Sequence, residues 1–238
     1  MEYKYTGIIL NKRDVGETDR IYTLYTQEGG KIKSLAKGVR KPHAKLAASL
    51  ENITLADVTL MRTKGLGKIT GSIVEDNFTF LKSDCDALLK TFDALKTFDK
   101  LVDFEHPDEN TFNLLKSFLE TINASVISFD IEKYEILRLG FIMKLLNALG
   151  YTIEVSSCVI CGAGLSKESI YFSARHGGVL CENCKQSSQG TISVRPDAVK
   201  MLRLFLGNEM RSLSKIKASQ ADHDSARLML DEFLRWNL

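Results

Sequence analysis

Four of the five cysteines in this 238-residue chain form two C-x-x-C pairs, and this pattern constrains the fold more than any other feature. The pairs are Cys158/Cys161 and Cys181/Cys184, with 19 residues between them. Two pairs at such a spacing place four thiolates around one tetrahedral metal ion, each pair on a tight turn. We therefore predict one structural zinc ion bound by the four cysteines, in a ribbon that spans residues 155–188.

Three other uses of these cysteines compete with zinc. Disulfides are rare in a chain without an export signal, and the charged opening MEYKYTGIILNKRD does not resemble a signal peptide. A redox pair belongs at a strand-to-helix junction, whereas here two pairs flank the strand-turn-strand pattern IYFSARHGGVL. An iron–sulfur cluster would use the same four ligands and stays open as an alternative.

Zinc with four cysteine ligands has no free position for an activated water molecule. His176 lies inside the ribbon, next to two glycines, and is predicted to be a solvated turn residue. A base deaminase would need an H-x-E motif ahead of the cysteines, and none of the four histidines begins one. Cys85 is predicted to be an ordinary small residue at the start of a helix. We expect the metal to be structural and the protein not to be an enzyme.

The first third of the chain has the composition of short strands. Ile, Val, Thr and Tyr are frequent in it, and EGG and KGLG provide turns. We predict strands at 3–12, 19–27, 31–38, 53–62 and 67–75. Five strands without intervening helices indicate a small closed or partly open barrel, of which the OB-fold is the five-stranded type.

The apolar period then changes to three and four residues, as in amphipathic helices. We predict helices at 84–103, 111–123 and 130–149, a fourth that opens near Pro196, and a fifth at 221–236. The fold class is therefore α+β and multidomain: an OB-fold domain (residues 1–80), then a mainly helical domain (residues 81–238) that contains the zinc ribbon. The most apolar stretch, 136–150, is too short to span a bilayer, so we expect a soluble intracellular protein without membrane contact.

The net charge of +2 conceals an uneven distribution. Residues 1–82 have 14 Lys and Arg against 9 Asp and Glu, and residues 83–150 have 7 against 12. The stretch KIKSLAKGVRKPHAK has no acidic residue, and we expect its cations to be open to solvent, where they can follow a phosphate backbone. The predicted DNA-binding residues are Arg13, Arg20, Lys31, Lys33, Lys37, Arg40, Lys41 and Lys45. Tyr22 and Tyr25 could stack on bases, but we expect them in the core.

The stretch 13–41 resembles the opening of the RecO family of bacterial recombination mediators. An R-x-x-G-E-x-(D/S) turn precedes a strand, followed by T-x-x-x-G and a basic K-G-x-R segment. The residues of these motifs are Arg13, Gly16, Glu17, Asp19, Thr26, Gly30, Lys37, Gly38 and Arg40. The order of the motifs and the later paired cysteines extend the resemblance over the whole chain.

The resemblance implies an OB-fold, binding of single- and double-stranded DNA, annealing of complementary strands and help in replacing single-strand-binding protein (SSB) by RecA. It implies RecR and the acidic C-terminal tail of SSB as partners, RecA indirectly, and a place in the bacterial cytoplasm near the nucleoid. Some members of the family lack the cysteines, which favours a structural metal. A pocket of the helical domain with apolar residues and an Arg or Lys would suit the tail, which ends in a carboxylate.

Two other functions fit parts of the sequence. A zinc-containing adaptor would bind proteins through the ribbon and the helices, without direct DNA binding. A nuclease would need clustered carboxylates for Mg²⁺, but the acidic residues of 84–109 are spread along helical faces. The non-enzymatic DNA-binding mediator is the hypothesis that accounts for most features.

Overall fold

A computed structural model describes residues 1–62, 65–128, 131–165 and 170–237. The chain forms two compact units, Met1–Asn123 and Ala124–Leu238, and each is described by itself. The first unit contains a barrel and the helices that follow it, so it extends beyond residue 80. The domain boundary at residue 80 therefore stays a prediction, whereas the α+β class, with the barrel first and the helices after it, is confirmed.

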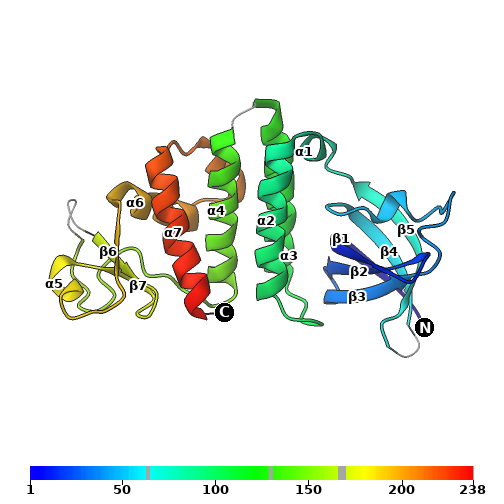
Figure 1. The fold of residues 1–238 in the computed structure, drawn as a ribbon, viewed down its shortest axis with the longest axis horizontal. Coiled ribbons are helices and arrows are strands. Elements are labelled where there is room, and N and C mark those ends of the chain that lie inside the picture. The colour runs from blue at the N-terminus through cyan, green and yellow to red at the C-terminus, as the bar shows by residue number, and fades with distance from the viewer. Residues whose placement is uncertain (63–64, 129–130, 166–169, 238) are drawn as a thin grey trace. The chain divides into compact units, whose positions relative to one another are not determined.

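The first unit begins with a closed five-stranded barrel (Figure 1). The strand order around it is β1-β2-β3-β5-β4, so the predicted barrel is closed rather than partly open. Its strands are β1 (Glu2–Val15), β2 (Asp19–Thr26), β3 (Gly30–Ala36), β4 (Leu55–Met61) and β5 (Lys68–Asp76). β1 is longer than predicted because a register shift between Ile9 and Asn11 bends it, which lets it pair with both β2 and β4.

The barrel core is built from alternate residues of the strands, as the period of a β-strand requires. Tyr22 and Tyr25 are 0% and 1% exposed, so their prediction as core residues is confirmed. Tyr25 packs edge-to-face on Phe98 with ring centroids 4.9 Å apart, and it also stacks on Phe112. Both phenylalanines belong to the helices that follow the barrel, so aromatic packing joins the helices to β2.

Three helices follow the barrel in the first unit: α1 (Thr79–Ser83), α2 (Cys85–Leu101) and α3 (Glu109–Ser125). Asp84 caps α2 by accepting a hydrogen bond from the backbone N–H of Ala87. The apolar faces that predicted α2 and α3 are buried, with Leu95, Phe98, Phe112 and Phe118 among their residues. α1 was not predicted, because five residues are too few to show a helical period.

The connection between α2 and α3 lies against the edge of β3. The backbone N–H of Glu105 donates to the carbonyl of Lys31 at 2.9 Å, and Phe104 forms a parallel bridge with Lys31. β5 pairs with β3 only at Leu35, so this connection is the backbone that lies beside Lys31. Gly30 has a positive φ of 62°, and a Cβ built on it would lie 2.5 Å from the carbonyl carbon and oxygen of His106.

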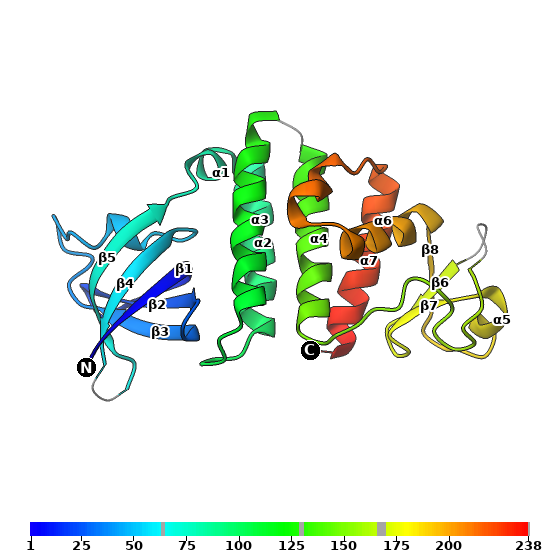
Figure 2. The same cartoon turned by 180° about the vertical axis from the view of Figure 1, so that it is seen from behind.

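Helices α4 (Ile131–Ala148), α6 (Pro196–Gly207) and α7 (Gln220–Asn237) pack together in the second unit, with a 3-10 helix at Met210–Lys215 (Figure 2). The predicted helix 130–149 becomes α4, and residue 130 lies outside the described residues. Gly140 lets α4 pack closely against this 3-10 helix, since a Cβ at residue 140 would lie 2.4 Å from the side chain of Leu213. None of the described helices combines the length and apolarity needed to cross a bilayer.

The cysteine ribbon follows α4 along the chain. Strands β6 (Ile170–Ser173) and β7 (Gly178–Leu180) form the predicted strand-turn-strand, and β8 (Ile192–Val194) completes a sheet in the order β7-β6-β8. A short helix, α5 (Glu182–Lys185), begins directly after Cys181. The sequence predicted neither α5 nor β8, because segments of three or four residues show no period.

Gly30→Ala should lower the free energy of unfolding by about 2–5 kcal/mol. A left-handed backbone costs a residue with a Cβ about 1–2 kcal/mol, and the contact with His106 adds about 1–3 kcal/mol of overpacking. Gly16→Ala is the matched control, because Gly16 has a φ of 60° but no atom within 4 Å of the added Cβ. Urea unfolding measures both variants, and equal losses would show that the connection can move away from β3.

Candidate metal centre and basic surface

The structure brings the four paired cysteines together. The Sγ atoms of Cys158, Cys161, Cys181 and Cys184 all lie within 4.8 Å of one another, and those of Cys161 and Cys181 are 3.8 Å apart. Four sulfur ligands at ~2.3 Å from a tetrahedral ion would be separated by about 3.8 Å. The arrangement therefore has the size and the donor chemistry for a single metal ion.

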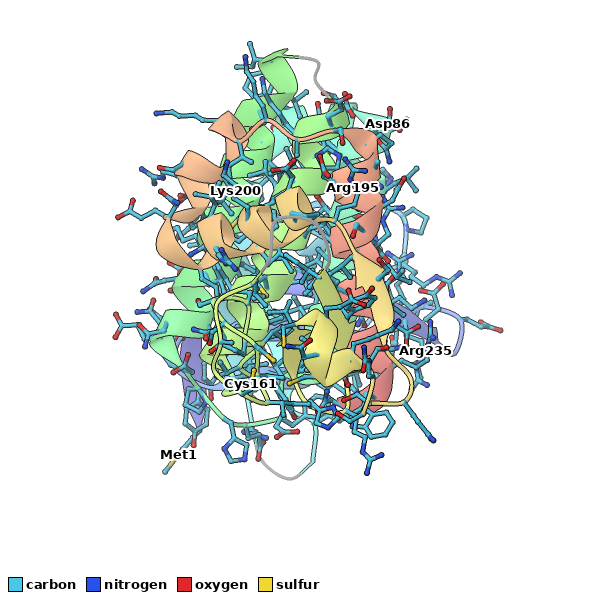
Figure 3. The ribbon with its side chains drawn as sticks, turned by 90° about the vertical axis from the view of Figure 1, so that its left-hand side faces the viewer. Met1, Asp86, Cys161, Arg195, Lys200 and Arg235 are labelled. Carbon is cyan, nitrogen blue, oxygen red and sulfur yellow. The ribbon has the colours of Figure 1, made fainter. Side chains whose placement is uncertain are left out.

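Two tight turns of the backbone position the sulfur atoms. In the first, the N–H of Gly162 donates to the carbonyl of Cys158 at 2.8 Å, and Gly162 adopts a φ of 71°. In the second, β7 leads into Cys181, and Cys184 lies one turn further along α5. Figure 3 shows Cys161 beside this short helix. Because Cys158 is buried and Cys161 is exposed, the site opens to solvent on one side.

Hydrogen bonds make the thiols of the cluster differ in acidity. Burial raises the pKa of Cys158, but hydrogen bonds from the backbone N–H groups of Cys161, Cys181 and Ile160 outweigh it and hold this pKa at about 6. Hydrogen bonding to Cys161, with burial and the other thiols, raises the pKa of Cys184 to about 12. The backbone thus favours a thiolate at Cys158, which is the form that ligates metals.

Neither His176 nor Cys85 belongs to this cluster. His176 is exposed, and its Nδ1 lies 2.9 Å from the hydroxyl oxygen of Ser173, on the turn between β6 and β7. Within the described ranges, the four cysteines are the members of the potential metal-binding group. Cys85 is exposed at the start of α2, in the first unit.

Lys31 does not lie in a solvent-exposed basic surface, so the expectation that every cation from Lys31 to Lys45 is open to solvent is wrong at this residue. Its side chain is buried, and the ammonium donates to the carbonyls of Asp99 and Val102, the latter at 2.9 Å. The carboxylate of Asp99 lies 3.1 Å from it. These carbonyls end α2, where the helix dipole attracts a cation, so α2 covers the part of β3 that alternation alone would leave open.

Two of the predicted arginines share an acidic partner. Arg20 donates to Asp14 at 2.6 Å, and Arg40 lies 3.4 Å from the other oxygen of the same carboxylate. The hydrogen bond from Arg20 holds the pKa of Asp14 below its usual value. Two guanidinium groups around one carboxylate retain a net positive charge, but these arginines are less available to phosphate than an unpaired cation.

The loop after β3 presents cations that are more available. Lys37, Lys41 and Lys45 are exposed, and no ion pair within 4.0 Å is found for them among the described residues. Asp19 orders the start of this loop by accepting a hydrogen bond from the N–H of Gly38 at 2.7 Å, which lowers the pKa of Asp19. The loop is therefore fixed at its base by this hydrogen bond to the Asp19 carboxylate, while its lysines extend into solvent.

Arg13 and Lys33 lie on the outer face of β1, β2 and β3. Both line a hollow of about 320 Å³, together with Asn11, Ile21, Thr23, Leu66 and Asp99. A second hollow of about 380 Å³ shares Lys33 and Leu66 and adds Phe104, an exposed aromatic residue of the α2–α3 connection. The sequence does not predict Phe104 as a site residue, because a single aromatic residue in an irregular connection shows no pattern.

The second unit has a hollow of its own, between α6 and the segment that leads into α7. It has a volume of about 510 Å³. Its lining combines apolar residues with two lysines: Met201, Leu204, Ile216, Lys200 and Lys217, with Asp197, Ala218, Ser219 and Asp222 at its border. Lys200 lies on α6 (Figure 3). Asp222 is already engaged, since Arg195 donates to it at 2.5 Å.

Comparison with known proteins identifies the family. The model of the recombination protein O N-terminal region matches residues 1–78, and that of the C-terminal region matches residues 84–238. Three proteins named DNA repair protein RecO illustrate the likeness. The one from Roseiflexus sp. is 29% identical over 98% of this chain and 80% of its own length.

The second, from Dehalococcoides mccartyi strain CBDB1, is 31% identical over 92% of this chain and 84% of its own length. The third, from Bacillus pumilus, is 29% identical over 98% and 88%. The two family models together cover nearly the whole chain, in the order of its barrel and its helical part. The chain belongs to the recombination protein O (RecO) family.

Proposed function

We propose that this protein is a non-enzymatic mediator of DNA repair and recombination. It binds single- and double-stranded DNA, anneals complementary strands and assists the exchange of SSB for RecA. The observation that carries the proposal is the exposure of three loop lysines, Lys37, Lys41 and Lys45, after β3 of an OB-type barrel in a chain of the RecO family. The names of the relatives support the biological role.

The physical basis of annealing is charge neutralisation. Two DNA strands repel each other, and a cationic surface that holds both lowers this repulsion, so that their bases come close enough to pair. Each phosphate contact also releases condensed counterions, which makes binding steeply dependent on salt. Lysines on a loop suit this task, because their flexible side chains follow a backbone without selecting a base sequence.

We further propose that the bound metal is zinc and that its role is structural. Four thiolates complete a tetrahedral coordination shell, so this donor set would hold zinc without an open position for catalysis. The metal would connect the turn at Cys158 to the start of α5 at Cys181. These segments are separated along the chain, and a common ion would keep the small sheet between them folded.

The proposed protein partners are RecR and SSB, with RecA served indirectly on the strand that SSB vacates. Family membership supports these partners. For the acidic SSB tail we propose the hollow next to α6, because its apolar lining suits side chains of a peptide and Lys200 and Lys217 suit a terminal carboxylate. We place the protein in the bacterial cytoplasm, at the nucleoid where its DNA substrate lies.

The double substitution Lys37→Gln/Lys41→Gln should weaken binding to DNA of any sequence. Each lost phosphate contact makes the negative slope of log K against log salt less steep, by about 0.7 on single strands and about 0.9 on duplex. Fluorescence anisotropy at several salt concentrations measures this slope. Lys96→Gln/Lys100→Gln on α2 changes the net charge equally and is the control.

The same variants should differ in annealing of SSB-coated complementary oligonucleotides, with the loop variant slower than the control. Equal DNA affinity of the two variants at every salt concentration would contradict the assignment of this surface. Wild-type protein that binds SSB or RecR but no DNA would instead favour the adaptor function.

Cys161→Ser should lower the content of bound metal and loosen residues 155–188 without unfolding the barrel. A missing ligand leaves three thiolates, and structural zinc contributes directly to folding. Elemental analysis identifies and counts the ion, and hydrogen exchange locates the change. Cys85→Ser is the matched control and should retain one zinc per chain. Iron in the purified protein, or a normal metal content in Cys161→Ser, would contradict the proposal.

Lys200→Glu and Lys217→Glu should each weaken binding of a fluorescent SSB-tail peptide about tenfold or more, because each removes a charge-assisted contact with the carboxylate. Arg175→Glu, on the β6–β7 turn, is the control with the same change of charge. A peptide with an amidated C-terminus should bind the wild type less tightly. If amidation has no effect, the terminal carboxylate does not occupy this hollow.

A further inference from the structure

Phe104 is an apolar aromatic residue on the surface of the first unit, with 43% of its area exposed. Its backbone is held in place, because Phe104 bridges to Lys31 and the next N–H donates to the carbonyl of Lys31. Glu105 adopts a positive φ of 60°, an unfavourable conformation for a residue other than glycine. Backbone contacts and a strained neighbouring residue therefore hold this exposed ring in a fixed position.

The surroundings of the ring are cationic. The ammonium groups of Lys31 and Lys33 lie 4.4 and 4.6 Å from the ring centroid. Lys31 is buried and paired with Asp99, whereas Lys33 is exposed. Arg62 lines the same hollow and is neutralised by an ion pair with Glu105. Lys33 lies over the ring, and because its side chain is exposed it can move to a phosphate and leave that face of the ring to a base.

The hollow at Phe104 continues into the one at Arg13. The two share Lys33 and Leu66, and Arg13 is a second exposed cation for which the described residues provide no ion-pair partner. The hollows lie along β2 and β3 and next to the β4–β5 connection, the face on which OB-folds bind oligonucleotides. A ring, an apolar floor and two separated cations match the chemistry of consecutive nucleotides, whose bases are flat and whose phosphates are anionic.

We propose that Phe104 is a base-stacking residue for single-stranded DNA, with Lys33 and Arg13 on the adjacent phosphates. This inference rests on the proposed function and adds a strand preference to it. Every base has a π-face, so stacking on Phe104 would be independent of sequence. The bases of a duplex are already stacked on one another, so the ring contributes to binding of unpaired strands only. The loop lysines bind both forms of DNA, and Phe104 distinguishes between them.

The test compares Phe104→Ala, Phe104→Leu and Phe104→Tyr in binding to oligo(dT) and to a duplex of the same length. Stacking of one base accounts for about 5- to 150-fold in affinity, so the Ala and Leu variants should lose that factor on oligo(dT). On the duplex they should change less than twofold. Tyr retains the π-face and should retain the affinity for oligo(dT). Phe80→Ala is the matched control, because Phe80 is also an exposed phenylalanine of the first unit but lines neither hollow.

A second measurement does not depend on the stability of the truncated variants. Trp236 is the single tryptophan and is exposed, so Phe104→Trp in a Trp236→Phe background places one fluorophore at the site. Stacking of thymine on the indole should quench its fluorescence, with a dependence on oligo(dT) concentration that matches the anisotropy. Duplex at saturation should leave the emission unchanged.

The outcomes separate this inference from the proposed function. If the wild type binds neither single strands nor duplex, the proposed function itself fails. If the wild type binds both, and Phe104→Leu binds oligo(dT) as tightly as Phe80→Ala does, the stacking role is overturned while DNA binding stands. Equal losses on oligo(dT) and duplex, or quenching by duplex, would also overturn the role of Phe104.

Discussion

The buried ammonium of Lys31 is the interaction on which the first unit depends. An ammonium group has three donors, and three acceptors surround it: the carbonyls of Asp99 and Val102 and the carboxylate of Asp99. The cation thus donates hydrogen bonds to carbonyl groups at the C-terminal end of α2, and the negative end of the helix dipole attracts it. Its position fixes the end of α2 on β3, and the connection that follows, with Phe104, is fixed by the backbone contacts of the same residue.

Lys31 also shows that a lysine in a basic stretch of sequence does not always lie on a DNA-binding surface. Lys31 and Lys33 alternate along β3, so both project from the same side of the strand. Lys31 stabilises the fold, whereas Lys33, two residues further along, is exposed beside the same aromatic ring. The difference comes from α2, which covers one position and not the other. A helix about seventy residues away along the chain therefore determines which cation reaches solvent.

The features that the sequence predicted well are those with a local or periodic signal. Turn glycines and β-branched residues identified the five barrel strands, and the burial of Tyr22 and Tyr25 followed from the same pattern. The spacing of the cysteines identified four side chains that the fold brings within 4.8 Å. Phe104 and the hollow next to α6 have no such signal, because they depend on contacts between segments that are far apart in sequence. The pairing of Arg20 and Arg40 with Asp14 is equally a product of folding.

The α2–α3 connection has a consequence for the solubility of the barrel. β5 accompanies β3 only at Leu35, so the Gly30–Lys33 stretch would otherwise present free N–H and C=O groups at an open sheet edge. Such an edge recruits strands from other molecules and leads to aggregation. Phe104 and Glu105 occupy it with backbone that cannot extend into a further strand, because Glu105 turns away in a left-handed conformation. The segment therefore covers a strand edge that would otherwise be available for pairing with a strand of another chain.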